Sequence, residues 1–110
     1  MTATAYVVAE DAAVELDRVV ERLRTMSLVR LSAEWPPHAS RAVAARELAQ
    51  RLADLGADTG GWPSREVPDA GHAAVGDQVA VTGRDLLALD PPESVRADMA
   101  EMLREIRLSL

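Results

Sequence analysis

Apolar residues recur every three or four positions in four separate stretches of this chain, and this period constrains its fold more than any other feature. The stretches cover about residues 9–27, 38–55, 70–89 and 92–108. Such spacing places side chains on one face of an α-helix, whereas a half-buried strand needs strict alternation. Short connections between helices favour antiparallel neighbours. We therefore expect an all-α fold in which residues 1–110 form a single-domain four-helix antiparallel bundle.

Proline and glycine mark the predicted ends of these helices. Two prolines at residues 36–37 precede the second helix, and Gly56 can end it, because glycine readily adopts the left-handed conformation that follows many helices. Before the fourth helix, Asp90 and Glu93 flank two further prolines. A short polar residue with Glu three positions later is typical of a capping box. The sequence therefore predicts that Asp90 is the N-cap of the fourth helix.

The third predicted helix is apolar around most of its circumference. Val81 and Ala88 lie opposite its main apolar face, between charged neighbours. The chain contains 20 Ala, 13 Leu and 12 Val but no Phe, so its core buries little area per residue. Both features favour self-association, because a second copy would cover additional apolar surface. We expect a homodimer whose contact includes either the second apolar side of the third helix, with Val81 and Ala88 as the diagnostic positions, or the narrow apolar stripe of the fourth helix.

The charge balance argues against nucleic acid as a partner. The formal net charge is −6 at pH 7, and residues 56–110 carry 5 Arg against 10 acidic residues. An acidic domain without a basic face repels phosphate, so we expect no nucleic-acid partner. The sequence contains no cysteine, no apolar run long enough to span a bilayer and no secretory leader pattern in residues 1–9. We therefore expect no membrane association and a cytoplasmic location.

His72 is the strongest candidate for a ligand-binding residue. On an ideal helix it shares a face with Gly76 and Gly83, and the two glycines would leave a furrow beneath the imidazole. Asp77 and Arg84 would then lie at the rim of this furrow. A histidine above a small cavity could bind a small molecule or move a proton. The favoured alternative is that the glycines let a neighbouring helix approach closely, because small residues in helices usually serve packing.

Signals for metal binding and catalysis are weak. Asp69 can cap the third helix, and it precedes His72 by three positions, which is the spacing of a metal-binding pair. His38 is the only other histidine, so too few ligands are present. No nucleophile, phosphate-binding or dinucleotide motif occurs. We therefore expect no metal, no cofactor and no catalytic residue, and an enzyme is the less favoured interpretation.

Two Trp-Pro pairs lie in the connections on either side of the second helix. Their indoles belong to Trp35 and Trp62. An exposed tryptophan could anchor a protein partner. The favoured interpretation is that each indole covers one end of the small core, because these are the largest apolar groups in the chain.

Three hypotheses about function follow from these features. The leading one is a non-enzymatic, homo-oligomeric interaction module whose protein partner the sequence does not name. The second is a small-molecule binding or catalytic bundle that uses the furrow at His72. The third is a transcription-associated helical domain.

Overall fold

Helices account for most of the chain. The computed structural model describes the backbone of residues 2–110 and the side chains of residues 12–110. The elements are α1 (Thr2–Thr25), α2 (Leu28–Ser32), α3 (Arg41–Gly60), the 3-10 turn η1 (His72–Ala74), α4 (Val75–Ala88) and α5 (Glu93–Ser109). No strand occurs within residues 2–110, where one isolated bridge joins Trp35 to His38. The all-α class is therefore confirmed.

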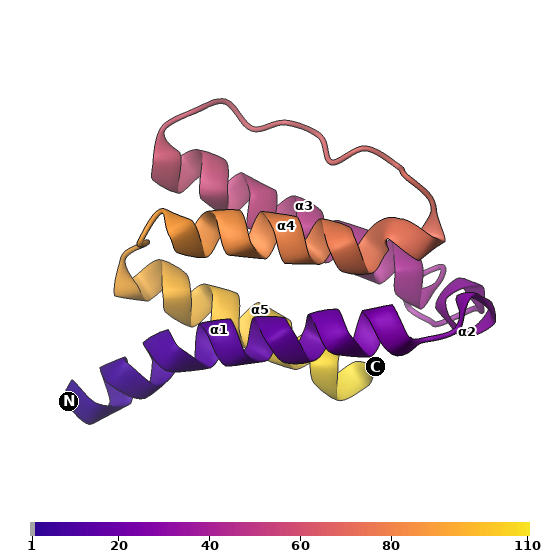
Figure 1. Cartoon of the computed structure of the whole chain (residues 1–110), viewed down its shortest axis with the longest axis horizontal. Coiled ribbons are helices and arrows are strands. Elements are labelled where there is room, and N and C mark those ends of the chain that lie inside the picture. The colour runs from indigo at the N-terminus through magenta and orange to yellow at the C-terminus, as the bar shows by residue number, and fades with distance from the viewer. Residues whose placement is uncertain (1) are drawn as a thin grey trace.

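The four long helices differ from the expected arrangement in their directions. α1 and α5 run the same way, and α3 and α4 both run opposite to them (Figure 1). The parallel pair α3 and α4 departs from the simple antiparallel bundle, in which consecutive helices alternate. The cause is the connection 61–71, which returns along the whole bundle. Eleven extended residues reach about 36 Å, which exceeds the roughly 30 Å length of a 20-residue helix such as α3.

Helix α3 begins and ends later than its sequence signals predict. Ser40 is the N-cap, and its hydroxyl oxygen accepts a hydrogen bond from the Val43 amide at 3.1 Å. The prediction that Gly56 ends the helix is wrong, because α3 continues through it to Gly60. Gly61 follows with φ of 78°, and its amide bonds to a carbonyl in the last turn. The left-handed conformation that ends a helix therefore occurs at Gly61.

The predicted N-caps of the last two helices are also wrong. Asp69 accepts a hydrogen bond from the Gly71 amide at 3.1 Å, which forms a local turn, and α4 begins only at Val75. Asp90 adopts a left-handed conformation with φ of 48°, and its carboxylate accepts a hydrogen bond from Arg96 at 2.7 Å. The extended residue before α5 is Pro92. The capping geometry that Asp90 would need is therefore absent.

A single apolar core lies between the four long helices, with α2 covering one end. The stripes predicted from helical spacing supply its largest fully buried side chains. These are Leu16, Leu23, Leu52, Leu86, Met99 and Leu103. Helical period alone therefore identifies the core of this chain.

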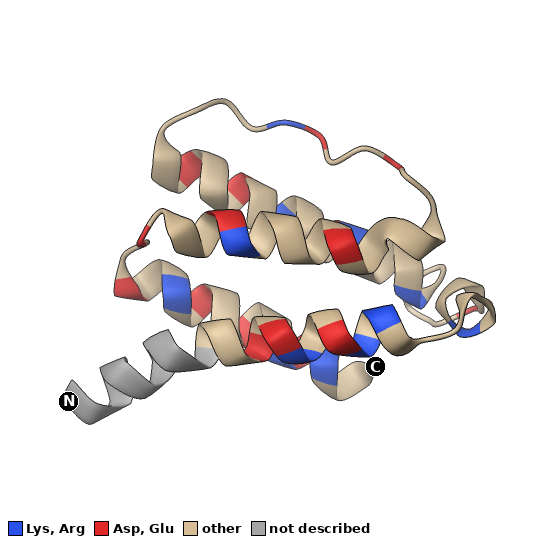
Figure 2. Cartoon of the chain, in the orientation of Figure 1, with Lys and Arg blue, Asp and Glu red and all other residues tan. Residues whose placement is uncertain are grey.

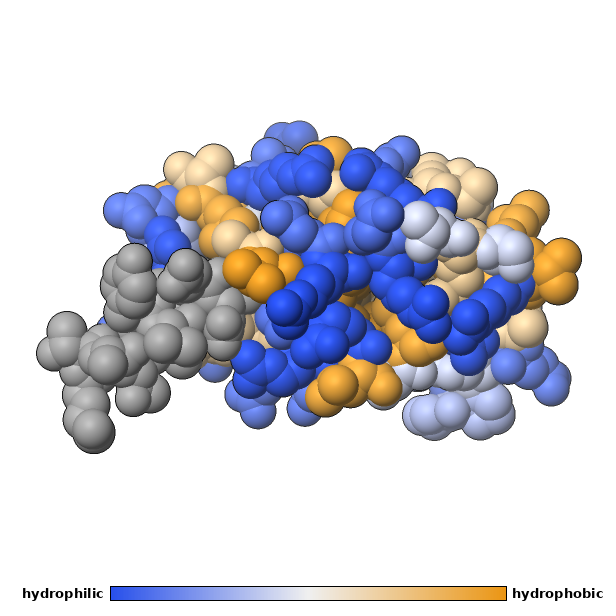
Figure 3. All heavy atoms as spheres, turned by 60° about the horizontal axis from the view of Figure 1, so that its bottom comes forward, coloured by the Kyte–Doolittle hydropathy of each residue, from blue (hydrophilic) through white to orange (hydrophobic). Residues whose placement is uncertain are grey.

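The outer surface carries charges of both signs. Figure 2 shows acidic and basic residues distributed along all four long helices. Figure 3 looks at the face that carries α1 and α5, where hydrophilic side chains predominate and hydrophobic ones form only separate spots. Within residues 2–110, no helix is both long enough and apolar enough to cross a membrane.

Candidate functional site

The bundle is open between α3 and α5. α1 packs along α4 and α5, and α3 packs along α4, but α3 and α5 touch at few positions. Three adjoining hollows of about 520, 430 and 320 Å³ follow this opening. Arg51 and Met102 line all three hollows, so they form one continuous surface. We call this surface the α3–α5 groove.

The floor of the groove is apolar. Ala44 and Leu48 of α3 form its most deeply buried part, with 4% and 3% of their surface exposed. Leu55 of α3 and Met102 and Ile106 of α5 are partly buried and pack against the core from the groove side. These residues recur four and seven positions apart, which places them along one side of each helix. Each of the two helices therefore has an apolar strip beside its core face.

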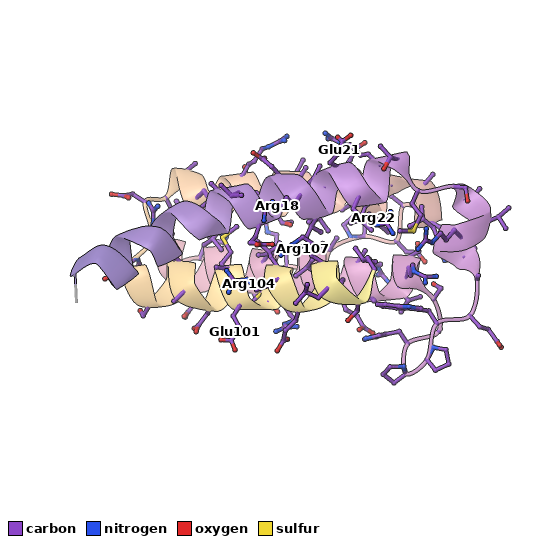
Figure 4. All side chains as sticks on the ribbon, turned by 90° about the horizontal axis from the view of Figure 1, so that it is seen from below. Arg18, Glu21, Arg22, Glu101, Arg104 and Arg107 are labelled. Atoms are coloured by element: carbon purple, nitrogen blue, oxygen red, sulfur yellow. The ribbon has the colours of Figure 1, made fainter. Side chains whose placement is uncertain are left out.

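The rim of the groove is acidic. Six carboxylates line it, together with one arginine, Arg51, and one histidine, His38. The carboxylates are Glu47, Asp54, Asp58, Asp98, Glu101 and Glu105. Figure 4 shows Glu101 pointing away from the space between α1 and α5. On α5, Asp98, Glu101 and Glu105 line the groove, whereas Arg104 and Arg107 lie towards α1 (Figure 4).

One rim carboxylate is held by neutral hydrogen-bond donors. The Ser64 hydroxyl and the Gln50 side-chain amide both donate to Asp54. These two hydrogen bonds, with that from Ser64 the larger cause, lower the pKa of Asp54. The carboxylate is therefore ionised at neutral pH, and no cation neutralises it among these contacts.

An aromatic turn closes one end of the groove. The Trp35 indole stacks on the His38 imidazole, with ring centroids 5.6 Å apart and planes inclined by 20°. The guanidinium of Arg41, the first residue of α3, lies 5.1 Å from the centre of the Trp35 indole. His38 Nδ1 lies 3.2 Å from a carboxylate oxygen of Glu47, which ties the turn to the rim. Trp35 is half-buried: its indole packs against the core and also lines the groove.

A second charged cluster lies between α1 and α5, where three arginines surround one buried carboxylate. Glu15 is 3% exposed and accepts hydrogen bonds from Arg107 at 2.5 and 3.1 Å. Arg18 and Arg104 lie 3.5 and 3.7 Å from the same carboxylate. The Arg107 hydrogen bonds lower the pKa of Glu15 against the opposing effect of burial. Figure 4 shows these arginines along the line where the two helices meet, so the cluster joins α1 to α5.

The furrow predicted beneath His72 is occupied by α1. A Cβ atom on Gly83 would lie 2.5 Å from Cδ1 of Leu16, and one on Gly76 would lie 3.2 Å from Cγ of Arg24. The glycines therefore allow close approach of a helix, as the favoured alternative predicts. His72 itself lies in η1, before α4, where its Nδ1 is 2.7 Å from the Ser32 hydroxyl.

The two charged residues predicted beside that furrow lie on the outer side of α4. Asp77 accepts two hydrogen bonds from Arg24 of α1, at 2.8 and 3.0 Å. Arg84 is exposed. Asp77 therefore contacts α1. Among the described contacts, no hydrogen bond or ion pair joins Asp77 to His72. Ligand binding at these positions stays a prediction.

The predicted partner-binding residues lie at separate places. Val81 is 58% exposed on α4, and Ala88 is exposed two turns further along the same helix. Trp62 is 49% exposed just after α3, where its amide donates to the Ala57 carbonyl. Only Trp35 of the four contributes to the groove.

The groove itself was not foreseen from the sequence. The sequence places Met102 and Ile106 on the narrow apolar stripe of the fourth helix, which is one of the two contacts expected for a dimer, and it does not predict a groove beside them. The available signal was the acidic series Asp98, Glu101 and Glu105, which shares one side of a helix next to apolar residues. That signal indicates a charged border, but it does not show that α3 would leave the border uncovered.

Comparison with protein families, with curated proteins and with solved structures finds no significant match. Among residues 12–110, no three His, Asp or Glu side chains lie close enough together to hold a metal ion. Function is therefore inferred from the geometry of the groove.

Proposed function

We propose that the protein is a non-enzymatic interaction module that binds a helix of a partner protein in the α3–α5 groove. The observation that carries this proposal is the continuous apolar floor between two helices that scarcely touch. A third helix lying between α3 and α5 would cover Leu55, Met102 and Ile106. Helix-in-groove binding of this kind uses apolar side chains on one face of the incoming helix.

The charge of the rim supports a protein rather than a nucleic acid as the partner. Six carboxylates and one arginine line the groove. This arrangement repels the phosphates of DNA and RNA. A peptide can combine apolar side chains for the floor with polar groups for the rim, which a nucleic acid cannot.

Trp35 provides a direct test, because its indole lines the groove. In a Trp62→Phe background it is the one remaining tryptophan of the chain. We would add three 14-residue helical peptides that share a leucine face and carry Arg, Gln or Glu at their polar positions. At least one peptide should change the Trp35 emission in a saturable manner. If none of the three does so, the proposed function is wrong.

Matched substitutions distinguish the groove from other apolar surface. Ile106→Gln places a polar group on the floor, and Val14→Gln makes the same kind of change at a position on α1 that is 40% exposed. Ile106→Gln should weaken peptide binding, and Val14→Gln should leave it unchanged. Circular dichroism of both variants checks that the fold persists. Equal effects of the two substitutions would contradict docking in the groove.

Self-association through α4 is a second proposal, and the exposure of Val81 favours it. Val81, which is 58% exposed, and the exposed Ala88 two turns further along α4 offer two small apolar positions to a second copy. Val81→Glu would place an unpaired charge in that contact and dissociate a two-fold dimer. Sedimentation of both proteins at micromolar concentration is the test. A monomeric wild-type protein rejects the dimer, and a dimer that survives Val81→Glu rejects this interface.

A further inference from the structure

We propose that the occupant of the α3–α5 groove is a basic amphipathic helix of about four turns, with apolar side chains on one face and arginine or lysine along both edges. This inference rests on the proposed function and adds the chemistry and length of the partner. It is carried by the pairing of an apolar floor with an acidic rim on both sides.

The rim charges lie where the edges of a docked helix would be. On α3, Glu47, Asp54 and Asp58 border the floor on one side. On α5, Asp98, Glu101 and Glu105 border it on the other side. A helix lying between them would bring its flanking residues against carboxylates on both sides. Opposite charges at such edges raise the association rate and exclude partners of the wrong sign.

The basic residues near the rim do not cancel this charge. Arg51 is the one arginine that lines the groove, and it is exposed. His38 is beside Glu47, so it can neutralise at most one carboxylate when protonated. Asp54 is hydrogen-bonded by neutral groups only. The groove therefore keeps a net negative charge that an occupant must match.

A second copy of this chain does not fit the groove. Two copies related by a two-fold axis through the groove would bring two acidic rims together, and like charges in such a contact are unfavourable. The arginine-rich part of α1 cannot serve as the occupant either. Its apolar residues Leu16, Val19 and Leu23 are at most 2% exposed within the core.

The length of the groove sets the length of the occupant. The lining residues of α3 extend from Ala44 to Asp58. At 1.5 Å per residue this stretch is about 21 Å long, which equals about four turns of a docked helix. A shorter segment would leave part of the groove uncovered.

The test compares the Arg, Gln and Glu peptides by fluorescence anisotropy, with a dye at one peptide end. The Arg peptide should bind at least about tenfold more tightly than the Glu peptide at low salt. This preference should shrink as the salt concentration rises, because exposed charges are screened. If the Gln or Glu peptide binds as tightly as the Arg peptide, the groove still binds a helix but the inferred partner chemistry is wrong.

Charge-neutral substitutions locate the effect on the rim. The double variant Glu101→Gln/Glu105→Gln removes two groove carboxylates, and Asp17→Asn/Glu21→Gln removes two exposed carboxylates of α1. Figure 4 shows Glu21 pointing away from α5. The groove variant should bind the Arg peptide about three- to tenfold more weakly, and the α1 variant should bind it as the wild type does. Equal losses in the two variants would indicate attraction by net charge alone and would overturn the inference.

Discussion

Gly83 lies where α4 passes closest to Leu16 of α1, and replacing it with alanine tests this contact. The new Cβ would lie 2.5 Å from Cδ1 and 2.8 Å from Cδ2 of Leu16. Carbon atoms in ordinary contact are about 3.5–4.0 Å apart. Leu16 is 1% exposed, so its side chain cannot turn towards solvent. The Gly83→Ala protein must therefore displace a packed core residue or separate two helices.

Two opposing effects determine the size of the change. Alanine is favoured over glycine by about 1 kcal/mol inside a helix. Overpacking a core costs about 1–3 kcal/mol. We therefore expect Gly83→Ala to lower the free energy of unfolding by about 0–2 kcal/mol, and Gly83→Leu to lower it further. Urea unfolding followed by far-ultraviolet circular dichroism measures both values.

Gly56 provides the matched control for helix propensity. It lies inside α3, and no atom beyond its own helix backbone and chain neighbours would come within 4 Å of a new Cβ. Gly56→Ala should therefore raise the free energy of unfolding by about 1 kcal/mol. In a Leu16→Ala background, Gly83→Ala should also become stabilising, because the obstructing side chain is gone. If Gly83→Ala stabilises the wild-type protein as much as Gly56→Ala does, the close approach of α1 and α4 is refuted.

Two further predictions concern charged residues. Glu15→Gln should lower the free energy of unfolding by about 1.5–3 kcal/mol at pH 7, because it weakens the hydrogen bonds from Arg107. Folding lowers the pKa of Glu15. The stabilisation by its carboxylate is therefore complete above the ordinary pKa of 4.5 and is lost as the pH falls through the lower pKa of the folded state. Acid unfolding curves of the Glu15→Gln protein should lack that loss. Asp90→Gly should be more stable than Asp90→Ala by about 1 kcal/mol in thermal melts, because φ is 48° there, and equal stabilities would contradict the left-handed conformation.

The core was predictable from sequence because it depends on a local period. Leu52, Leu86 and Met99 all occupy predicted stripes and are fully buried. An apolar stripe indicates which side of a helix is buried, and it can be identified without knowing which helices lie beside it.

Helix directions and ends were less predictable because they depend on competing or distant signals. Gly56 and Gly61 both permit a left-handed helix end, and only the folded chain shows that the end occurs at Gly61. Aspartate is a residue type that commonly forms an N-cap, but Asp90 pairs with Arg96 instead. The long connection 61–71 permitted both a hairpin and a full return along the bundle, so it did not fix the direction of α4.

The candidate site was not predictable for a related reason. Met102 continues the apolar stripe of α5, so its sequence position predicts burial in the core. Whether it faces the core or a groove depends on how closely α3 approaches α5. That distance follows from the packing of α3 against α4, of α5 against α1 and of α1 against α4, which no local pattern records.

The most direct test of the central claim is methyl nuclear magnetic resonance of the methionines during addition of the Arg peptide. Met102 lines all three hollows of the groove, whereas Met99 is fully buried in the core and Met26, directly after α1, lines none of the three hollows. Docking in the α3–α5 groove predicts that the Met102 methyl signal shifts with saturation while those of Met99 and Met26 change little. A saturable interaction that leaves the Met102 signal unchanged would contradict the account.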